Sequence, residues 1–312
     1  MASLAASRRR KSTSPNLSDR PPKHPRRRLK IISALVFAAA LLGAIFVWNI
    51  GGVLVAPSNR PIGSPPANLR AEVVEFPSAS GATLHGWLVA GQPGKGAVVL
   101  MHGVHANRLS LVARAEFLAR AGYAVLLFDF QGHGESLGKT ITFGFLESRD
   151  ATAAVKLVRE KFPGEKIGVI GISLGAAAAL LAEPPLPVNA LVLESSYPTI
   201  YQATENRMGL RFGFLGKLAT PLLACQLKPR LGIGLDDLKP IQHAAKITVP
   251  KFFIAGTADR DTTLPESQAL FAAAAEPKQC WWLDGAGHVD MHAFAKVEYE
   301  KRLLDFLAVH LH

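Results

Sequence analysis

Short apolar runs alternate with longer amphipathic stretches along the chain after residue 71. Continuous apolar runs bounded by turn residues are typical of strands buried on both faces, and apolar residues at a 3.6-residue period are typical of helices. Strands are predicted at residues 71–76, 83–90, 96–103, 123–130, 166–171, 189–196, 251–256 and 280–285. Helices are predicted between them, at residues 110–122, 147–162, 174–183, 265–275 and 292–310. This alternation indicates an α/β fold with a mostly parallel sheet covered by helices on both faces.

Capping residues mark the ends of one of these helices, and one long segment departs from the alternation of strands and helices. Ser110 is a suitable N-cap for the helix at residues 110–122, and Gly122 is a suitable end. The exception is residues 197–248, a long stretch between two strands that is punctuated by glycine and proline. Long segments of this kind in compact domains are often functional, so we expect an irregular cap inserted at about residues 197–248.

The N-terminal part of the chain has a different pattern. Residues 31–56 contain no charged side chain, and about 20 apolar residues suffice to span a bilayer. Trp48 suits the far membrane interface, and the basic cluster Arg26–Lys30 favours a cytoplasmic N-terminus. We therefore expect a single-pass transmembrane signal anchor at residues 31–56, with the rest of the chain after it on the extracytoplasmic side. A cleaved signal peptide would have a shorter apolar core and an evident cleavage site, and a buried core helix would lack the basic flank.

The net charge of +11 is concentrated at the N-terminus. Residues 1–30 hold ten Lys or Arg and one Asp, so the other 282 residues carry only +2. This distribution predicts a basic, disordered cytoplasmic tail at residues 1–30, and it gives no sign of a nucleic-acid-binding face. Residues 57–70 are rich in proline and are expected to link the anchor to a domain at residues 71–312.

Polar residues end several of the predicted strands. In α/β sheets, sites form at the carboxyl ends of the strands, so these residues are expected to carry the chemistry. They are His102, Gly103, Asp129, Ser173, Glu194, Asp259 and, just beyond a strand, His288. The set contains a nucleophile, acids and a base.

Ser173 lies in the sequence GISLG, which matches the motif G-x-S-x-G. Gly171 and Gly175 are required there because the strand-to-helix turn is so sharp that larger side chains would clash. The turn would hold the serine oxygen at a helix N-terminus, where the helix dipole favours negative charge. An ordinary glycine-softened turn is the alternative. The strand before and the alanine-rich helix after Ser173 favour the nucleophile.

A serine hydroxyl needs a base that is oriented by an acid. His288, on the glycine-containing loop after the last strand, is the candidate base. Asp259 is the preferred acid because it follows the preceding strand closely, and Asp261 and Glu194 remain alternatives. The chain order Ser173, Asp259, His288 is the order that this strand–turn–helix motif requires.

Attack by a serine on a carbonyl group also needs backbone donors for the developing oxyanion. The N–H of Leu174 follows directly from the turn at the serine. The second donor should come from the loop MHGVHAN, and we assign it to the N–H of Val104, directly after His102 and Gly103. His102 is expected to hold this loop by hydrogen bonds, with a role as base as the alternative.

Together these motifs resemble the α/β-hydrolase superfamily, and most closely the bacterial membrane-anchored hydrolases with a serine-aminopeptidase-like or Bem46-like domain. The segments that carry the resemblance are HGVHANR, FDFQGHGES, GISLG, AGTADRDTT and GAGH, within residues 71–310. The resemblance implies an eight-stranded sheet, a Ser–His–acid triad, no metal and no cofactor. Gln131 stands where those relatives commonly have arginine, so the salt bridge of that arginine is not expected here.

The expected function is a serine hydrolase that cleaves an ester, thioester or amide through an acyl-enzyme. Acyl transfer to an acceptor other than water would use the same residues. A catalytically silent binding domain and a structural membrane protein are alternatives, and the complete set of triad and oxyanion positions disfavours both.

A small-molecule or lipid-like acyl substrate is expected, and the N-terminal helix provides the contact with the membrane. Apolar cap residues favour an apolar acyl group, although packing of the cap itself explains them equally well. They include Tyr197, Tyr201, Phe212, Phe214 and Leu215. No acidic cluster that would hold a free amino terminus stands out, which weakens an aminopeptidase interpretation.

The two cysteines, Cys225 and Cys280, add little. The sequence contains no C-x-x-C or His/Cys cluster that would indicate a structural metal. We expect two unpaired and mostly buried thiols.

Overall fold

The computed structural model describes residues 25–312, so residues 1–24 of the tail predicted at residues 1–30 lie outside the described residues. The chain divides into two compact units, Met1–Phe46 and Val47–His312. One helix, α1 (Pro25–Val55), begins in the first unit and ends in the second. The prediction of a disordered tail up to residue 30 is wrong for residues 25–30, which are helical. Proline is favoured at the first helical position, and Arg, Leu and Lys are good helix formers, so the apolar helix extends into the basic cluster.

The first unit consists, in its described part, of α1 up to Phe46. The segment Arg26–Val55 has 30 residues and a mean hydropathy of 2.5. It is long and apolar enough to cross a membrane, since about 20 apolar residues suffice.

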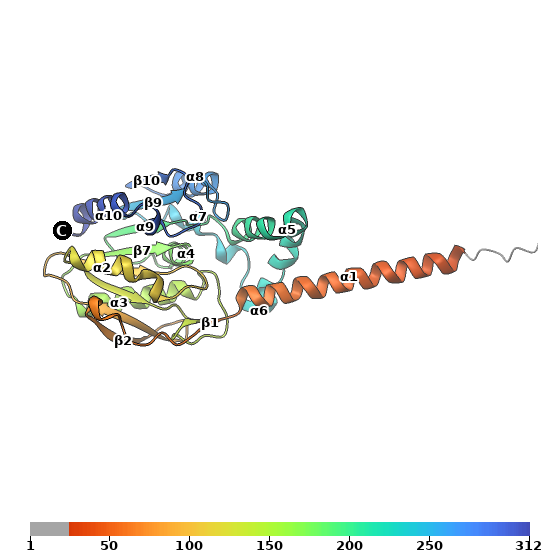
Figure 1. The fold of residues 1–312 in the computed structure, drawn as a ribbon, viewed down its shortest axis with the longest axis horizontal. Coiled ribbons are helices and arrows are strands. Elements are labelled where there is room, and N and C mark those ends of the chain that lie inside the picture. Colours follow the sequence, from red (N-terminus) through yellow and green to blue (C-terminus); the bar gives the residue numbers. More distant parts are fainter. Residues whose placement is uncertain (1–24) are drawn as a thin grey trace, which may run out of the picture. The chain divides into compact units, whose positions relative to one another are not determined.

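The second unit is built on an eight-stranded sheet with the order β10-β9-β8-β7-β4-β5-β3-β2. Figure 1 shows β10 and β2 on opposite sides of this unit, with β7 between them. Its strands are β2 (Ala71–Pro77), β3 (Thr83–Val89), β4 (Ala97–Met101), β5 (Ala124–Phe128), β7 (Ile167–Ile172), β8 (Ala190–Glu194), β9 (Lys251–Gly256) and β10 (Lys278–Leu283). β3 pairs antiparallel with both β2 and β5, and the other pairs of this sheet are parallel. The predicted α/β fold with a mostly parallel sheet is confirmed.

Helices cover both faces of this sheet, and every residue of the central strand β4 is buried. Val98 and Leu100 face a cluster that includes residues of α2 (Val112–Arg120) and α10 (Lys296–Leu311). Val99 and Met101 face the opposite cluster, with residues of α3 (Glu147–Lys161), α4 (Leu174–Leu181) and α8 (Leu264–Ala273). Successive side chains of a strand point to opposite faces, so a strand covered on both sides is continuously apolar.

Two predicted helices begin or continue differently from expectation. The helix expected to start at Ser110 is preceded by a short 3-10 helix, η2 (Arg108–Leu111), and the cap is Asn107, whose side chain accepts a hydrogen bond from Leu109 N. Ser110 lies one turn too late to cap, and its hydroxyl donates to Asn107 O instead. The helix expected at residues 292–310 is split into α9 (Met291–Phe294) and α10.

The segment predicted as an irregular cap is largely helical. It contains α5 (Ile200–Ala224), α6 (Leu227–Leu231), the 3-10 helix η3 (Asp236–Leu238) and α7 (Pro240–Ala244). Gly213 has a φ of 59° and breaks α5 into two helical parts. The glycine that suggested a loop therefore marks a kink, because only there does the backbone leave the helical region.

The segment predicted as a linker also carries short elements. β1 (Ser58–Asn59) pairs in parallel with β6 (His133–Gly134), and η1 (Ala67–Leu69) follows. Cys225 and Cys280 are free, as predicted, but both are exposed rather than buried. Cys225 directly follows α5, and Cys280 lies on the edge strand β10, so neither reaches the core.

Candidate active site

Ser173 lies at the turn between β7 and α4. Its backbone has φ 50° and ψ −103°, a conformation that L residues adopt only at a cost, and its side chain is almost completely buried. A Cβ on Gly175 would lie 2.5 Å from Met101 O, and one on Gly171 would lie 2.6 Å from Ala176 N. Both neighbours are backbone atoms, which cannot rotate away. The turn at Ser173 therefore requires both glycines, for the steric reason predicted.

The structure brings Asp259 and His288 together. His288 Nδ1 lies 2.8 Å from Asp259 Oδ2, and the two residues follow β9 and β10, which are neighbours in the sheet. Thr262 donates to the same carboxylate twice, from its hydroxyl to Oδ2 at 2.8 Å and from its N–H to Oδ1 at 2.9 Å. The N–H of Asp261 also donates to Oδ1, at 2.9 Å. The carboxylate of Asp259 is thus held in place by donors on both oxygens.

These contacts favour the ionised form of Asp259. Burial by itself would raise the pKa of this carboxyl group, but the hydrogen bond and charge of His288 and the two hydrogen bonds from Thr262 outweigh it. The pKa of Asp259 is consequently below its ordinary value. A carboxylate beside the imidazole favours the tautomer with the proton on Nδ1, which leaves Nε2 as an acceptor.

The alternative acids have other partners. Asp261 forms an ion pair with Arg207, whose Nε lies 3.0 Å from Asp261 Oδ1. Glu194 is buried and accepts hydrogen bonds from Arg114 and from the Tyr299 hydroxyl. Arg114 also lies 2.8 Å from Asp290, two residues after His288. Glu194 therefore belongs to a buried network that ties the end of β8 to the loop of His288.

The loop after β4 places Val104 beside Ser173. Val104, Ser173, Leu174 and Thr262 line one pocket, together with apolar residues such as Phe143 and Ile200. We call this space the serine pocket. The N–H groups of Val104 and Leu174 make no hydrogen bond within residues 25–312. Both are available to an oxygen bound in the serine pocket.

His102 is fully buried and uses both ring nitrogens. Its Nε2 accepts from Phe130 N at 3.1 Å, so the proton lies on Nδ1, which donates to Gly103 O at 2.7 Å. Burial, with a contribution from neighbouring His133, lowers the pKa of His102 to about 3. The ring is therefore neutral and connects the Gly103 loop to the strand end after β5.

A buried charge cluster supports the same loops. Arg108 pairs with Asp129 and with Glu135 through its guanidinium, and its N–H donates to Asp129 Oδ1 at 2.7 Å. Gln131, at the position where relatives commonly have arginine, donates instead to Glu147 Oε1 at 2.7 Å and to Thr140 O at 2.8 Å. As predicted, a neutral amide at this position makes hydrogen bonds and no salt bridge.

Several residues of this site were not predicted from the sequence. Thr262, Arg207 and Phe143 line the serine pocket, and Arg114 holds Asp290. For Thr262 a signal was present, because a hydroxyl three residues after an acid can hydrogen-bond to it, as in the TADRDTT segment. The structure holds no group of three or more His, Cys, Asp or Glu side chains arranged for a metal ion among residues 25–312.

Known proteins share this architecture. A family model described as serine aminopeptidase, S33, matches residues 92–239. The protein Rv2307c of Mycobacterium tuberculosis is 30% identical over 267 residues, which cover 83% of this chain and 86% of that protein. The protein YqkD of Bacillus subtilis is 26% identical over 236 residues, or 74% of this chain and 77% of that protein. The structure of the Pyrococcus furiosus esterase Pf2001 matches with a TM-score of 0.68 and 26% identity, over 83% of this chain and all of that one.

The sheet order, the serine turn and these similarities define the class of protein. The chain belongs to the α/β-hydrolase family, as the resemblance of its motifs implied. Within that family it is similar to the group described as serine aminopeptidase, S33, and hydrolase activity is the function that this membership supports.

Proposed function

We propose that the protein is a membrane-anchored serine hydrolase that cleaves a carboxylic ester through an acyl-enzyme. The observation that carries this proposal is the contact of 2.8 Å between His288 and Asp259, in the loops after β10 and β9, at the same edge of the sheet as the strained turn of Ser173 after β7. The ester is preferred over the amide because the Pyrococcus furiosus neighbour is named an esterase, although a thioester or a peptide bond would use the same groups.

In the proposed mechanism, Ser173 Oγ attacks the carbonyl carbon while His288 Nε2 accepts its proton. Asp259 keeps the imidazole in the required tautomer and stabilises the imidazolium that forms. The N–H groups of Val104 and Leu174 stabilise the oxyanion, and each such donor contributes about 2.7–4 kcal/mol to lowering the barrier. His288 then protonates the leaving alcohol, and water hydrolyses the acyl-enzyme by the same proton transfers in reverse.

Membrane attachment is the second part of the proposal. It is supported by the length and hydropathy of α1 and by the basic residues Arg26–Lys30 at its start. The excess of basic residues puts the N-terminus in the cytoplasm and the hydrolase domain on the extracytoplasmic side. A phosphatase fused after His312 should be active in intact cells, and an inactive fusion beside an active cytoplasmic reporter would contradict this orientation.

Labelling by a fluorophosphonate probe tests the catalytic proposal. The wild-type protein should be labelled at Ser173, and Ser173→Ala should lose both labelling and turnover while keeping its thermal unfolding temperature. Ser110→Ala serves as the matched control, because Ser110 lies at η2 and its hydroxyl only bonds to Asn107. A folded wild-type protein that is neither labelled nor active would favour the alternative of a catalytically silent binding domain.

A further inference from the structure

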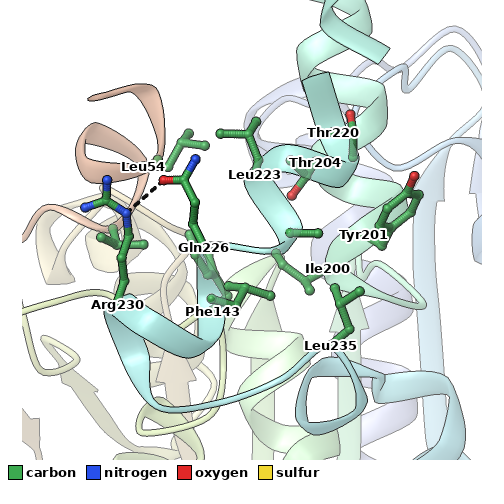
Figure 2. Close-up of a pocket in the computed structure, with 14 residues that line it drawn as sticks. Leu54, Phe143, Ile200, Tyr201, Thr204, Thr220, Leu223, Gln226, Arg230 and Leu235 are labelled. Carbon is green, nitrogen blue, oxygen red and sulfur yellow. Dashed lines mark hydrogen bonds between the residues drawn. The ribbon is translucent and has the colours of Figure 1, made fainter. Parts of the chain in front are cut away.

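A second pocket adjoins the serine pocket. Its apolar lining includes Leu54, Phe143, Ile200, Leu223, Leu227 and Leu235 (Figure 2). Leu54, Phe143, Ile200 and Thr204 line both pockets, so the two spaces share a wall. The second pocket has about 460 Å³ of empty space, including the part open to solvent. The lining is largely apolar, which suits an apolar ligand group.

The last turns of α1 form part of this second pocket. Gly51, Leu54 and Val55 line it, and these residues belong to the same compact unit as the hydrolase domain. α1 makes specific contacts with α6 and with Gln226, the residue directly before α6. Gln226 Nε2 donates to Val47 O at 3.1 Å, and the guanidinium of Arg230 lies 4.1 Å from the centre of the Trp48 ring. The end of the predicted anchor is therefore a wall of the pocket.

The cap helix α5 carries an apolar stripe near this wall. Phe214, Leu215, Leu218 and Leu222 recur at a spacing of about four residues, and their exposed fractions are 73%, 73%, 57% and 56%. This spacing places them on one side of the helix. Exposed apolar surface of this kind marks a contact with a partner or a membrane. The bilayer is the partner that the chain itself indicates for this stripe. Leu222 lies only four residues before Gln226, and Gln226 donates a hydrogen bond to α1, the helix proposed as the membrane anchor.

We propose that the second pocket binds the acyl chain of a long-chain lipid ester that enters from the bilayer. This inference rests on the proposed serine hydrolase and membrane anchor. The ester carbonyl lies at Ser173, and the chain extends past Leu54 and Ile200 toward the end of α1. The ester C–O bond breaks as Ser173 Oγ bonds to the acyl carbon, and the serine proton passes through His288 to the leaving alcohol. Hydrolysis of the acyl-enzyme by water releases the fatty acid.

Chain-length profiles test the acyl site. The full chain in detergent micelles is assayed with p-nitrophenyl esters of two to twelve carbons, below their own aggregation limits. Each methylene that enters the pocket should raise kcat/KM by up to about fourfold, until the pocket is filled. Ala224→Trp places an indole in the second pocket and should lower the ratio of decanoate to butyrate activity at least tenfold. Ala272→Trp, the same exchange at an exposed position of α8, should leave this ratio unchanged within about twofold.

The outcomes separate this inference from the proposed function. A protein that is labelled at Ser173 but shows a flat chain-length profile overturns the acyl site and leaves the hydrolase intact. A protein that is not labelled overturns both. If Ala224→Trp and Ala272→Trp shift the ratio equally, the second pocket is not the acyl site.

The source of the lipid has its own test. The protein is reconstituted into phosphatidylcholine vesicles, and p-nitrophenyl palmitate is placed either in the same vesicles or in separate ones. Entry from the bilayer predicts an initial rate at least tenfold higher when protein and ester share a vesicle. Equal initial rates would overturn entry from the bilayer.

Discussion

Replacement of Asp259 by asparagine should reverse the direction of the hydrogen bond between residue 259 and His288 Nδ1. All four contacts of the native carboxylate come from donors: two N–H groups reach Oδ1, and the Thr262 hydroxyl and His288 Nδ1 reach Oδ2. The N–H groups of Asp261 and Thr262 are fixed by the backbone, so the amide oxygen must take the position of Oδ1. The amide NH₂ then faces His288 Nδ1 and donates to it.

The expected consequence is a histidine in the wrong tautomer. With Nδ1 as an acceptor, the imidazole proton lies on Nε2, which can no longer accept the proton of Ser173. Replacement of a triad carboxylate by an amide lowers kcat by about 10⁴. At about 1.36 kcal/mol for each factor of ten, this corresponds to about 5.4 kcal/mol of barrier.

Asp261→Asn is the matched control. Asp261 is two residues away and pairs with Arg207 in a contact that is partly open to solvent, and such pairs contribute about 0–1 kcal/mol. Its activity should therefore stay within about fivefold of the wild type. Both variants are compared by kcat/KM on p-nitrophenyl butyrate and by thermal unfolding. If Asp259→Asn retains a tenth of wild-type activity, or if both variants lose the same amount, Asp259 does not orient His288.

Three further changes probe the supports of the site. Arg114→Met leaves Glu194 buried without its cation and should lower the free energy of unfolding by about 3–5 kcal/mol, measured by chemical denaturation. The double variant Arg114→Met, Glu194→Gln should regain part of that stability. A further loss of stability in the double variant would contradict the pairing. Gly175→Ala forces a Cβ against Met101 O and should destabilise by about 1–3 kcal/mol, while Gly234→Ala, with its nearest neighbour at 3.8 Å, should be nearly neutral. Partial burial would raise the pKa of Glu135, but N–H groups of Gly63 and Ile62 and the Arg108 guanidinium lower it to about 2. Because this pKa is depressed in the folded state, the stabilisation that Glu135 contributes is present above about pH 4.5 and is lost as the pH falls toward 2. Denaturation curves of Glu135→Gln should lose this dependence, and an unchanged slope between pH 5 and 3 would refute it.

The sheet was predictable because strands that are buried on both faces are continuously apolar in sequence. β4 was expected within residues 96–103 and spans Ala97–Met101, and all five of its residues are buried. The catalytic candidates followed from the same pattern, since Ser173 directly follows β7 and Asp259 and His288 lie three and five residues beyond the ends of β9 and β10. Asp259 and His288 come close together at the edge of the sheet because the strand order brings β9 and β10 side by side.

The contacts that orient these groups depend on tertiary structure. Arg114 on α2 reaches Asp290 across more than 170 residues of sequence, and no local period marks such a pair. The cap was misjudged for another reason. Glycine and proline count as loop signals when isolated, but in α5 the single break at Gly213 is flanked by helical runs that bury Met208 and Leu223.

Sequence composition and packing place the boundary between the N-terminal apolar segment and the folded domain at different residues. Composition changes at residue 56, yet Val55 O accepts a hydrogen bond from Ile141 N, and Ser58 pairs with the β6 loop. Because Gln226 and Arg230 also bind the backbone and ring of residues 47 and 48, the last turns of α1 are part of the folded domain. A helix that served only as a tether would need none of these contacts. Their presence supports the proposal that the end of α1 forms part of the acyl site.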